Sequence, residues 1–246
     1  MKINKKYLFD NLITFFYAFI IAIIIRTLLF QPFYIPSSSM EPNLLVGDRL
    51  FVSKYTYGYS KHSLPFSPKI SNKRFFFENP ERGDIVVFKT PADNRTDYIK
   101  RLIGLPGDEI QFINGDLFLN NNQILKTRKK IKNLKIFCGE RIIEAIAYDE
   151  KLPNGVSYTA VYSKNNTYQN SDKYIVPKNH FFFLGDNRDC SKDSRYLNSV
   201  GYVNRLNLVG KARLIFLSTD KNVGNIFQVW KWYKIIRWNR FFNIIN

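Results

Sequence analysis

The sequence predicts a mainly β fold of antiparallel sheets, preceded by one transmembrane helix. Two observations support this prediction: one uncharged apolar run lies near the N-terminus, and short β-rich runs separated by turn residues follow it. The 246 residues are enough for one large or two small domains. With 45% hydrophobic and 23% charged residues, the composition argues against wholesale disorder and against a polytopic membrane protein.

The apolar run is long enough to span a bilayer. At about 1.5 Å per helical residue, the run from Leu12 to Phe30 covers the roughly 30 Å of a hydrocarbon core. Arg26 lies close to the end of the run, where a long side chain reaches the membrane interface. A cleaved signal peptide needs small residues after its apolar core, whereas Gln31–Pro36 is bulky. We therefore expect residues 11–30 to be a retained transmembrane anchor.

Positive charge is biased toward the N-terminal side of this anchor. Lys2, Lys5 and Lys6 precede it, whereas Arg49 is the only lysine or arginine among residues 31–50. Cytoplasmic flanks of transmembrane helices carry such an excess of positive charge. The bias predicts a cytoplasmic N-terminus, with the rest of the chain after the anchor on the outer side of the membrane.

Beyond the anchor, the pattern is mostly β. The clearest element is a hairpin over residues 109–119, in which Ile110 and Phe112 lead to Asn114-Gly115, the pair that best supports the positive φ angles of a type I′ turn. Many short strands favour antiparallel sheets, as in a barrel or a sandwich. Further strands are expected at residues 49–53, 84–88, 155–162, 180–184 and 209–217.

The charge balance is strongly basic. The chain has 37 Lys and Arg against 20 Asp and Glu, a formal charge of +17, which points to phosphate-bearing partners, either nucleic acid or anionic lipid. A compositional bias from an AT-rich genome is an equally good explanation. Six of the cations lie within residues 126–135, where a solvated loop or hairpin edge is a simpler explanation than a nucleic-acid site.

The C-terminal residues 226–246 differ in kind from the rest of the chain. They mix tryptophan, tyrosine and phenylalanine with lysine and arginine, the composition of a segment that lies at the interface of an anionic membrane. A buried terminal helix is the alternative, and the sequence favours neither.

Cysteine and histidine are too few for a structural zinc site. Cys138, Cys190, His62 and His180 include no closely spaced ligand pair, so we expect neither a metal nor a cofactor. Whether the two cysteines form a disulfide is left open, because residues far apart in sequence need not meet in space. The scarcity of histidine leaves lysine as a candidate catalytic base.

The segment Ile35–Leu44, IPSSSMEPNL, is the most unusual in the chain. Ser38 with Glu41 three residues later could be a capping box that opens a helix. However, Pro42 would remove a backbone donor from the first turns, and no apolar helical stripe follows. Three serines between prolines, next to an anchor, instead favour an exposed nucleophile on an extended strand.

Two further segments combine polar and apolar residues. In Asp97–Asp108, Lys100 lies among tyrosine, isoleucine and leucine before a Gly-Leu-Pro-Gly turn; taken alone, this is a strand with an outward lysine. Leu184–Tyr196 is a dense polar loop after an apolar strand. An Asx-rich turn or a calcium site would also fit this loop, although its interspersed cations argue against calcium.

Together, and in this order, these segments resemble type I signal peptidases, the leader peptidases that remove secretory signal sequences. The resemblance covers most of residues 15–217. Each of its motifs is weak alone, but four motifs in register are specific. The first is RTLLF running into PSSSMEP at residues 26–42, and the second is RGDIVVF at 82–88. The third is YIKR with GLPGD at 98–108, and the fourth is GDNRD at 185–189, followed by Ser191 and by DSR at 193–195.

The resemblance implies a serine–lysine mechanism. Ser39 takes the place of the nucleophile and Lys100 that of the general base. Ser37 matches the position whose hydroxyl joins the Ser39 backbone amide in the oxyanion hole. Ser191 corresponds to the serine that orients the lysine amine.

The resemblance also implies supporting and substrate-binding residues. Asp193 and Arg195 match a polar pair that supports the loop. Two positions depart from the family pattern: Ser38 is often glycine and Cys190 is commonly asparagine, and neither removes a functional group from the mechanism. The pockets for small residues at the −1 and −3 positions of the substrate would be lined by Ile35, Met40, Leu44, Tyr98 and Ile99.

Physical chemistry permits this mechanism if the lysine is buried. A lysine with a pKa of about 10.4 is only about one part in 2,500 neutral at pH 7. Burial in an apolar site lowers the pKa by about 3 units and leaves a sizeable neutral fraction. Because Ser39 follows Phe30 by nine residues, it cannot lie more than roughly 30 Å from the helix end. Signal-peptide cleavage sites emerge within that distance of the membrane.

We therefore predict a membrane-bound signal peptidase I, a serine endopeptidase of the bacterial inner membrane with its catalytic domain on the periplasmic side. Its expected partners are secretory precursors and anionic membrane lipids, without nucleic acid, and a monomer is expected. The alternative is a membrane-tethered polyanion or nucleic-acid binding protein without enzymatic activity. The expected division is a cytoplasmic stretch 1–10, the anchor, a catalytic β core of 31–108 and 176–225, an inserted β region 109–175, and the interfacial segment 226–246.

Overall fold

The computed structural model describes residues 5–65, 67–68, 71, 73–131, 133–139, 141–165, 167–220, 222–224 and 228–245. The predictions that involve Lys2, Lys132, residues 226 and 227, and Asn246 lie outside the described residues.

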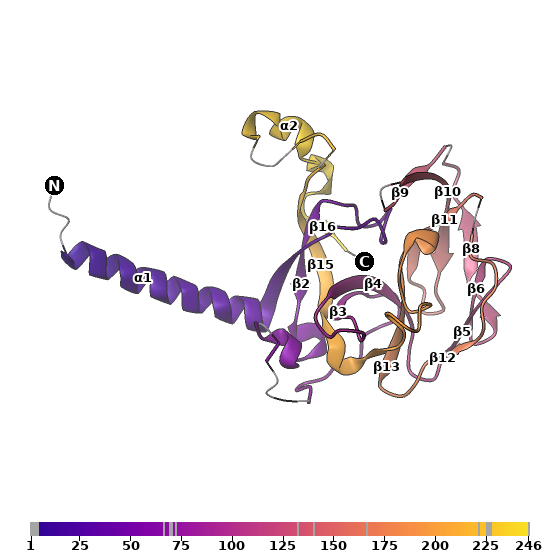
Figure 1. Ribbon diagram of the computed structural model, residues 1–246, viewed down its shortest axis with the longest axis horizontal. Coiled ribbons are helices and arrows are strands. Elements are labelled where there is room, and N and C mark those ends of the chain that lie inside the picture. Colours follow the sequence, from indigo (N-terminus) through magenta and orange to yellow (C-terminus); the bar gives the residue numbers. More distant parts are fainter. Residues whose placement is uncertain are drawn as a thin grey trace.

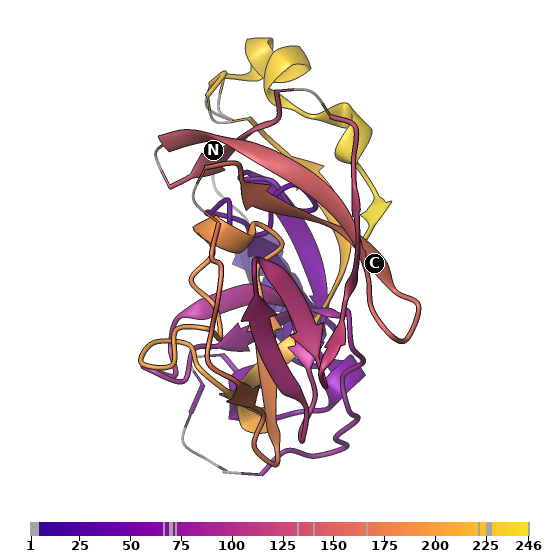
Figure 2. The same ribbon diagram turned by 90° about the vertical axis from the view of Figure 1, so that its right-hand side faces the viewer.

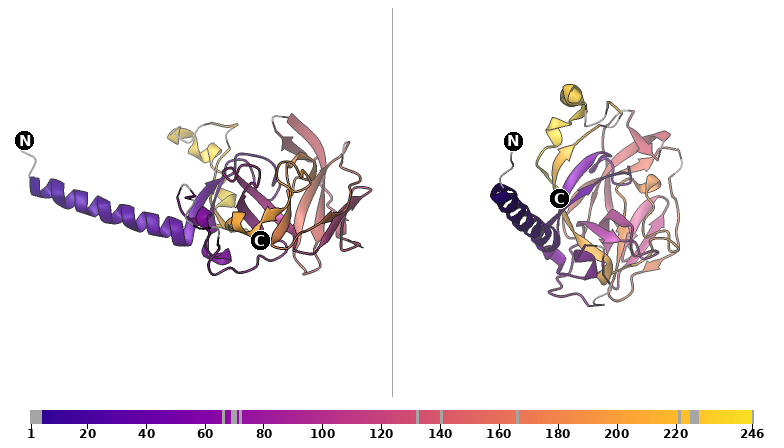
Figure 3. Two further views of the ribbon diagram at one scale, coloured as in Figure 1. Left: turned by 60° about the horizontal axis from the view of Figure 1, so that its bottom comes forward. Right: turned by 60° about the vertical axis from the view of Figure 1, so that its left-hand side comes forward.

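An N-terminal helix projects away from the rest of the chain (Figure 1; Figure 3, left). Helix α1 spans Lys5–Ile24 and continues into a π-helical turn, η1, at Ile25–Leu29. Within Phe9–Leu29, the most apolar 18-residue window has a mean hydropathy of 2.4 and is not buried against the protein. The helix is long and apolar enough to cross a membrane and fits a single-pass membrane protein. Phe30, which the sequence placed in the anchor, begins the first strand.

A large antiparallel sheet forms the body of the protein. Its strand order is β1-β2-β15-β3-β4-β13-β14, and β16 also pairs with β15. Its strands are β1 (Phe30–Tyr34), β2 (Asp48–Ser53), β3 (Ile85–Lys89), β4 (Asp97–Gly104), β13 (His180–Leu184), β14 (Val203–Asn204), β15 (Leu208–Ser218) and β16 (Asn243–Ile244).

The residues between β4 and β13 form two smaller sheets, which Figure 2 shows from their outer side. One has the order β12-β5-β6-β7, and the other has the order β11-β10-β8, with β9 also pairing with β10. The strands are β5 (Glu109–Ile113), β6 (Asp116–Leu119), β7 (Asn122–Gln123), β8 (Leu125–Arg128), β9 (Lys135–Cys138), β10 (Arg141–Lys151), β11 (Ser157–Ser163) and β12 (Tyr174–Ile175).

The connecting segments contain only short helices within the described part of the chain. They are the 3-10 helices η2 (Tyr55–Tyr57), η3 (Lys61–Ser63), η4 (Arg188–Cys190), η5 (Arg205–Asn207), η6 (Val229–Lys231) and η7 (Trp238–Arg240), and the one-turn helix α2 (Trp232–Ile235).

The structure confirms the predicted fold class, an antiparallel, mainly β protein with one apolar N-terminal helix. In the predicted hairpin, Ile113 lies opposite Asp116, which leaves Asn114 and Gly115 in the turn with φ angles of +51° and +80°. A type I′ turn requires positive φ at both positions. The five other predicted strands correspond to β2, β3, β11, β13 and β15.

Strand β10 was not predicted, although with 11 residues it is as long as β15. Charged residues interrupt its apolar pattern, because Arg141 and Glu144 are exposed and Glu150 is buried in an ion pair with Arg188. The basic segment 126–135 turns out to join two partners of this strand: β8 precedes the segment's loop, β9 begins at its end, and both pair with β10.

The large sheet is buried on both faces around β3. Ile85 and Val87 belong to a hydrophobic cluster with residues of β2 and β15. Val86 and Phe88, which point to the opposite face because side chains alternate along a strand, belong to a second cluster with residues of β4 and β13. The chain near β3 and β4 is therefore rigidly packed.

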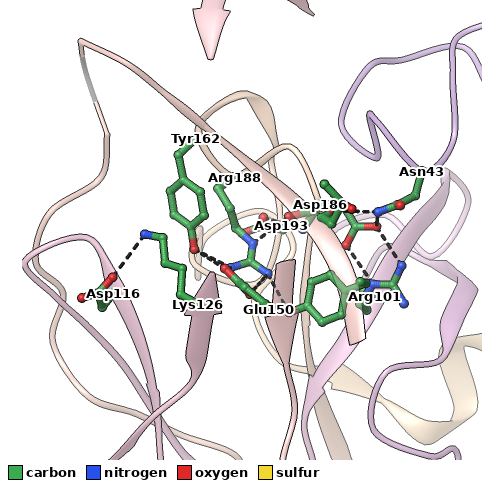
Figure 4. A network of polar contacts seen from close by, with 12 residues as sticks. Asn43, Arg101, Asp116, Lys126, Glu150, Tyr162, Asp186, Arg188 and Asp193 are labelled. Atoms are coloured by element: carbon green, nitrogen blue, oxygen red, sulfur yellow. Dashed lines mark hydrogen bonds and ion pairs between the residues drawn. The ribbon is translucent and has the colours of Figure 1, made fainter. Parts of the chain in front are cut away.

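A buried ion pair attaches the inserted sheets to the large sheet (Figure 4). The Arg188 guanidinium lies 2.8 Å from the Glu150 carboxylate, and both side chains are 1% exposed. Tyr158 and Tyr162 each accept a hydrogen bond from Arg188 and donate one to Glu150. Arg188 Nε also donates to the Gly185 carbonyl at 3.1 Å. The inserted region thus holds the loop that follows β13.

We expect Glu150→Leu to destabilise the protein strongly, because it leaves the Arg188 charge buried without a carboxylate. Losing one partner of a buried pair costs about 3–5 kcal/mol. Thermal unfolding of the full chain in detergent measures the effect. Glu144→Leu is the matched control, since the Glu144–Lys164 pair is about half exposed and such pairs contribute at most about 1 kcal/mol. Equal losses for the two variants would contradict the prediction.

Candidate active site

The serine segment is the connecting loop of the hairpin formed by β1 and β2. Ile35 N donates to the Asp48 carbonyl at 2.9 Å, and Gly47 N donates back to the Ile35 carbonyl at 3.0 Å. We call residues 35–48 the nucleophile loop, after Ser39, which the sequence predicts to be the nucleophile. Gly47 has a φ of +97°, and a Cβ there would lie 1.9 Å from the Thr219 carbonyl oxygen, so only glycine fits this closure.

The helix that Ser38 and Glu41 could have opened is not formed. The loop instead makes consecutive turns, with Glu41 N donating to the Ser38 carbonyl at 3.0 Å and Leu44 N donating to the Met40 carbonyl at 2.9 Å. The Glu41 carboxylate accepts a hydrogen bond from Phe137 N at 3.2 Å rather than capping a helix. Burial raises the pKa of Glu41, and its hydrogen bond to Phe137 partly opposes that rise.

Lys100 on β4 lies directly against Ser39. Its Nζ donates to Ser39 Oγ at 2.6 Å and to the Ile99 carbonyl at 2.9 Å. Both side chains are buried: Ser39 is 6% exposed and Lys100 is 3% exposed. The structure therefore places Lys100 inward, and the outward lysine that the strand pattern allowed is excluded.

Burial lowers the pKa of the Lys100 amine to about 8, although the Asp193 and Asp186 carboxylates partly oppose this change. At that pKa, roughly a tenth of the amine is neutral at pH 7, compared with about one part in 2,500 for a free lysine. The amine also lies 5.4 Å from the centroid of the Tyr98 ring. A buried, partly neutral amine beside a hydroxyl can accept a proton from it.

Ser37 lies beside Ser39, at the exposed edge of the site. Its Oγ is 3.4 Å from Ser39 Oγ. Ser191 lies on the other side, packed against Gly185, where a Cβ would be 2.2 Å from the Ser191 hydroxyl. The Ser191 hydroxyl is buried and makes no hydrogen bond of standard geometry to any described residue, but it lies close enough to the Asp193 carboxylate to help lower the pKa of that group. The Lys100 amine bonds elsewhere, so the structure does not show Ser191 orienting it.

Asp193 and Arg195 form a bidentate ion pair beneath this serine. Arg195 Nε and Nη2 lie 2.8 and 2.9 Å from the Asp193 carboxylate, which also accepts from Gly185 N at 3.0 Å. Burial opposes ionisation of Asp193, but the ion pair outweighs it and keeps the pKa of that carboxyl below its usual value. The pair ties both ends of the loop after β13 together.

Two residues of the same loop were not given roles from the sequence, although their motif was noted. Asp186 accepts from Arg101 Nε and Nη2 at 2.8 and 2.9 Å and from Asn43 Nδ2 at 2.6 Å (Figure 4). Asn187 N donates to the Ser39 carbonyl at 3.1 Å, and its amide donates to the Ser38 carbonyl at 3.0 Å. Each contact joins elements that the sequence cannot show to be neighbours.

Ser39 and Lys100 face a cleft of about 1060 Å³. Of the predicted substrate-binding residues, Ile35, Tyr98 and Ile99 line it. Met40 and Leu44 do not: they are 0% and 1% exposed and lie in the hydrophobic cluster beneath the cleft. The resemblance to the family placed their side chains at the substrate pockets, whereas the turns of the loop direct them into the core.

One wall of the cleft is fastened by a disulfide. Cys138 at the end of β9 and Cys190 in η4 are bonded, with their Cα atoms 5.1 Å apart. Residues 134–137 of this wall line the cleft on the side of Cys190. The spacing of the cysteines had left their pairing open, and the fold brings them together across the site.

The buried amine makes a pH-dependent contribution to stability. The pKa of Lys100 is about 8 in the folded chain and has its ordinary value of 10.5 when unfolded, so between these values the unfolded state binds more protons and stability rises with pH. Burying the charged amine therefore lowers the free energy of unfolding by its full amount below pH 8 and by nothing above pH 10.5. We expect Lys100→Met to raise Tm at pH 7 by removing up to roughly 3 kcal/mol of penalty.

Thermal unfolding of the full chain in detergent at pH 7 to 10 checks this expectation, and the gain should shrink across the range. Lys173→Met is the control, because Lys173 is about half exposed in its pair with Glu109. If Lys100→Met raises Tm by the same amount at every pH, burial does not lower the pKa of the Lys100 amine.

Comparisons with known proteins show the family to which the chain belongs. The sequence model of the family described as signal peptidase, peptidase S26, matches residues 8–217. The chain is 40% identical to signal peptidase I of Rickettsia massiliae, over 95% of this chain and 92% of that protein, and 38% identical to that of Rickettsia bellii, over 97% and 86%.

A crystal structure of a signal peptidase I from Enterococcus faecalis is also similar. It has 26% sequence identity and a TM-score of 0.33, and the match covers 55% of this chain and 97% of that one. The family match and the identity to the rickettsial proteins each extend over most of the chain. The chain therefore belongs to the signal peptidase family, peptidase S26.

Proposed function

We propose that the chain is a membrane-bound serine endopeptidase that removes N-terminal signal peptides from exported precursors, with Ser39 as nucleophile and Lys100 as general base. Family membership supports signal-peptide cleavage. The observation that carries the residue assignment is the 2.6 Å contact between the Lys100 amine and the Ser39 hydroxyl. The alternative polyanion-binding function leaves this contact without a role.

The neutral amine of Lys100 takes the proton of Ser39 as Oγ attacks the scissile carbonyl carbon. The carbonyl π bond opens to an oxyanion. When the tetrahedral intermediate collapses, the C–N bond breaks and the ammonium of Lys100 donates the proton to the leaving amine. Water then attacks the acyl-enzyme ester, Lys100 accepts its proton, and that proton returns to Ser39 Oγ as the signal peptide leaves as an acid.

The oxyanion would be bound by the Ser39 backbone amide and the Ser37 hydroxyl. The Ser39 amide donates no hydrogen bond to any described residue, and Ser37 Oγ lies 3.4 Å from Ser39 Oγ. Donors aimed at the developing charge in a site shielded from water contribute several kcal/mol to lowering the barrier.

An extended precursor would bind along the start of β4. Residues 98 and 99 pair with β3 on one edge, whereas β13 pairs only with residues 101, 102 and 104 on the other. The free edge faces the cleft, where Ile35, Tyr98 and Ile99 present apolar surface. The buried Met40 and Leu44 would act from beneath, by filling the core that supports the pocket floor. A shallow apolar pocket of this kind favours small residues at −1 and −3.

The anchor would hold the site at the outer surface of the bacterial inner membrane. The N-terminus would be cytoplasmic, and the catalytic core of residues 31–108 and 176–225 would lie outside, with 109–175 inserted into it. Ser39 follows the strand that leaves the helix directly, at Phe30. A precursor whose apolar segment spans the same bilayer would bring its cleavage site to this height.

The C-terminal segment would add a second contact with anionic lipids. Its tryptophans are exposed, with Trp230 at 69% and Trp238 at 59%, while Lys231 and Lys234 lie between them in sequence. In Figure 1, α2 lies at the top of the view, past the upper end of β15, while α1 projects to the left. Aromatic and basic side chains together favour the headgroup region of a membrane.

Cleavage tests the assignment of the catalytic pair. We expect Ser39→Ala and Lys100→Ala each to lower cleavage of an Ala-x-Ala precursor by more than about a thousandfold, because each removes a group that bonds or transfers a proton. In the wild type, activity should rise with pH through about 8, the pKa of Lys100. The readout is cleavage in detergent, with Ser38→Ala as the control that keeps activity. Substantial cleavage by either variant would refute the pair.

Tryptophan fluorescence tests the lipid contact, because all 3 tryptophans of the chain, Trp230, Trp232 and Trp238, lie in the C-terminal segment. In vesicles containing phosphatidylglycerol, we expect brominated lipid to quench the fluorescence of the full chain strongly, since the rings would lie at the headgroup level. The control replaces the three by phenylalanine and places one tryptophan at exposed Leu125 in the inserted region, which should not be quenched. If the full chain and the Leu125→Trp control are quenched equally, or if neither is quenched, the proposed lipid contact is refuted.

A further inference from the structure

The position of Ser39 depends on a loop that is held from its two ends. The nucleophile loop closes through the backbone pairing of Ile35 with Gly47 and Asp48. Tight turns then connect Ser39 to Leu44. Any displacement of residues 43–48 is therefore passed on to the serine through few rotatable bonds.

Arg240 from the C-terminal segment holds this loop on the far side of the turns. Its Nε and Nη2 lie 3.1 and 2.6 Å from the Asp48 carboxylate, and Nη2 also donates to the Asn43 carbonyl at 2.9 Å. Asp48 is fully buried, and its carboxylate also accepts from Leu45 N at 2.8 Å and from Ser218 Oγ at 2.6 Å. One guanidinium thus spans both ends of the segment 43–48.

Arg237 holds the middle of the same segment. Its Nη1 donates to the Val46 carbonyl at 2.9 Å, and its Nη2 lies 3.2 Å from the Asp220 carboxylate. Arg237 and Asp220 also line the cleft that contains Ser39 and Lys100. The two arginines together contact the carbonyl groups of residues 43 and 46, which accept no backbone hydrogen bond from any described residue.

The C-terminal segment is itself fixed to the large sheet, so the backbone that carries its two arginines is held in place. Residues 243 and 244 form β16 against β15, and Ile245 N donates to the Arg213 carbonyl at 2.9 Å. Arg237 N donates to the Ser218 carbonyl at 3.0 Å. Ile245 is buried in the same hydrophobic cluster as Met40 and Leu44.

The contacts continue from the loop to the neighbour of the lysine. Asn43, whose carbonyl accepts from Arg240, donates through its side-chain amide to the Asp186 carboxylate at 2.6 Å. Asp186 in turn binds Arg101, the residue after Lys100. Both members of the proposed catalytic pair are therefore connected to Arg240 through Asn43.

We propose that residues 236–245 act as a strap that positions the nucleophile loop, with Arg240 and Arg237 as positioning residues for Ser39. The strap lies beyond residue 217, where the family match ends. The proposal rests on the proposed peptidase function, because it is the attack by Ser39 that the strap would align. Misplacing a reacting group by about 1 Å can cost about a hundredfold in rate.

Kinetics of the full chain in detergent test the strap. We expect Arg240→Met to lower kcat about 10- to 100-fold while KM changes less than about threefold, since the cleft residues for substrate are untouched. The pH at which activity reaches half its maximum should stay unchanged, because Lys100 keeps its own surroundings. Arg240→Lys retains a cation for Asp48 but lacks the forked guanidinium that also reaches the Asn43 carbonyl. Its kcat should fall between those of the wild type and of Arg240→Met.

Three comparisons make the outcome decisive. Arg141→Met makes the same substitution on an exposed arginine and should leave kcat unchanged. Ile124→Ala creates a cavity in the core of the inserted region and so lowers Tm without touching the nucleophile loop. It should keep the wild-type kcat even where its Tm falls as far as that of Arg240→Met. If Arg240→Met fails to fold, the kcat of Arg240→Lys tests the strap instead. That variant should fold, because a lysine still neutralises the buried Asp48 carboxylate.

The strap is excluded if Arg240→Lys has wild-type kcat, or if Arg240→Met loses no more kcat than Ile124→Ala at the same Tm. Failure of the peptidase proposal looks different: in that case Ser39→Ala itself retains cleavage. An enzyme in which Ser39→Ala is inactive while both Arg240 variants are fully active therefore refutes the strap alone.

Discussion

An amine that is buried and partly uncharged, in contact with a hydroxyl, is the constraint around which the site is arranged. The surroundings of Lys100 must disfavour its charge, yet two carboxylates, Asp186 and Asp193, lie close enough to raise its pKa. Each of these carboxylates is bound bidentately by an arginine, Arg101 or Arg195. Because each pair is close to neutral as a unit, desolvation remains the largest effect on the lysine, and its pKa falls.

Burying these ion pairs requires protein on every side, and the two small sheets supply part of it. Arg188 in the loop after β13 is neutralised by Glu150, which lies on β10 of the inserted region. The hydroxyls of Tyr158 and Tyr162 complete its hydrogen bonds. A buried guanidinium without such partners would be strongly unfavourable. The inserted region therefore stabilises the same loop that carries Asp186, Ser191 and Asp193.

Much of the fold could be predicted from the sequence, because strand patterns and turn residues are local. The hairpin at Asn114-Gly115 is confirmed for that reason. Strand β10 was missed, since its charges belong to contacts with distant residues, as Glu150 does with Arg188. In the site, the motifs of the family brought Ser39 and Lys100 to attention. The burial of Met40 and Leu44, the packing of Ser191 and the contacts of Arg240 depend on tertiary geometry that no local pattern encodes.

The covalent link between Cys138 and Cys190 places a condition on how the protein matures. It joins segments that are 52 positions apart in the chain and that together form one wall of the cleft. Thiols are kept reduced in the cytosol and are oxidised in the bacterial periplasm. If the core lies in the periplasm, as proposed, a newly made chain would form this bond only after residue 190 had been translocated, and a chain still in the cytosol would have the two segments of this wall unlinked.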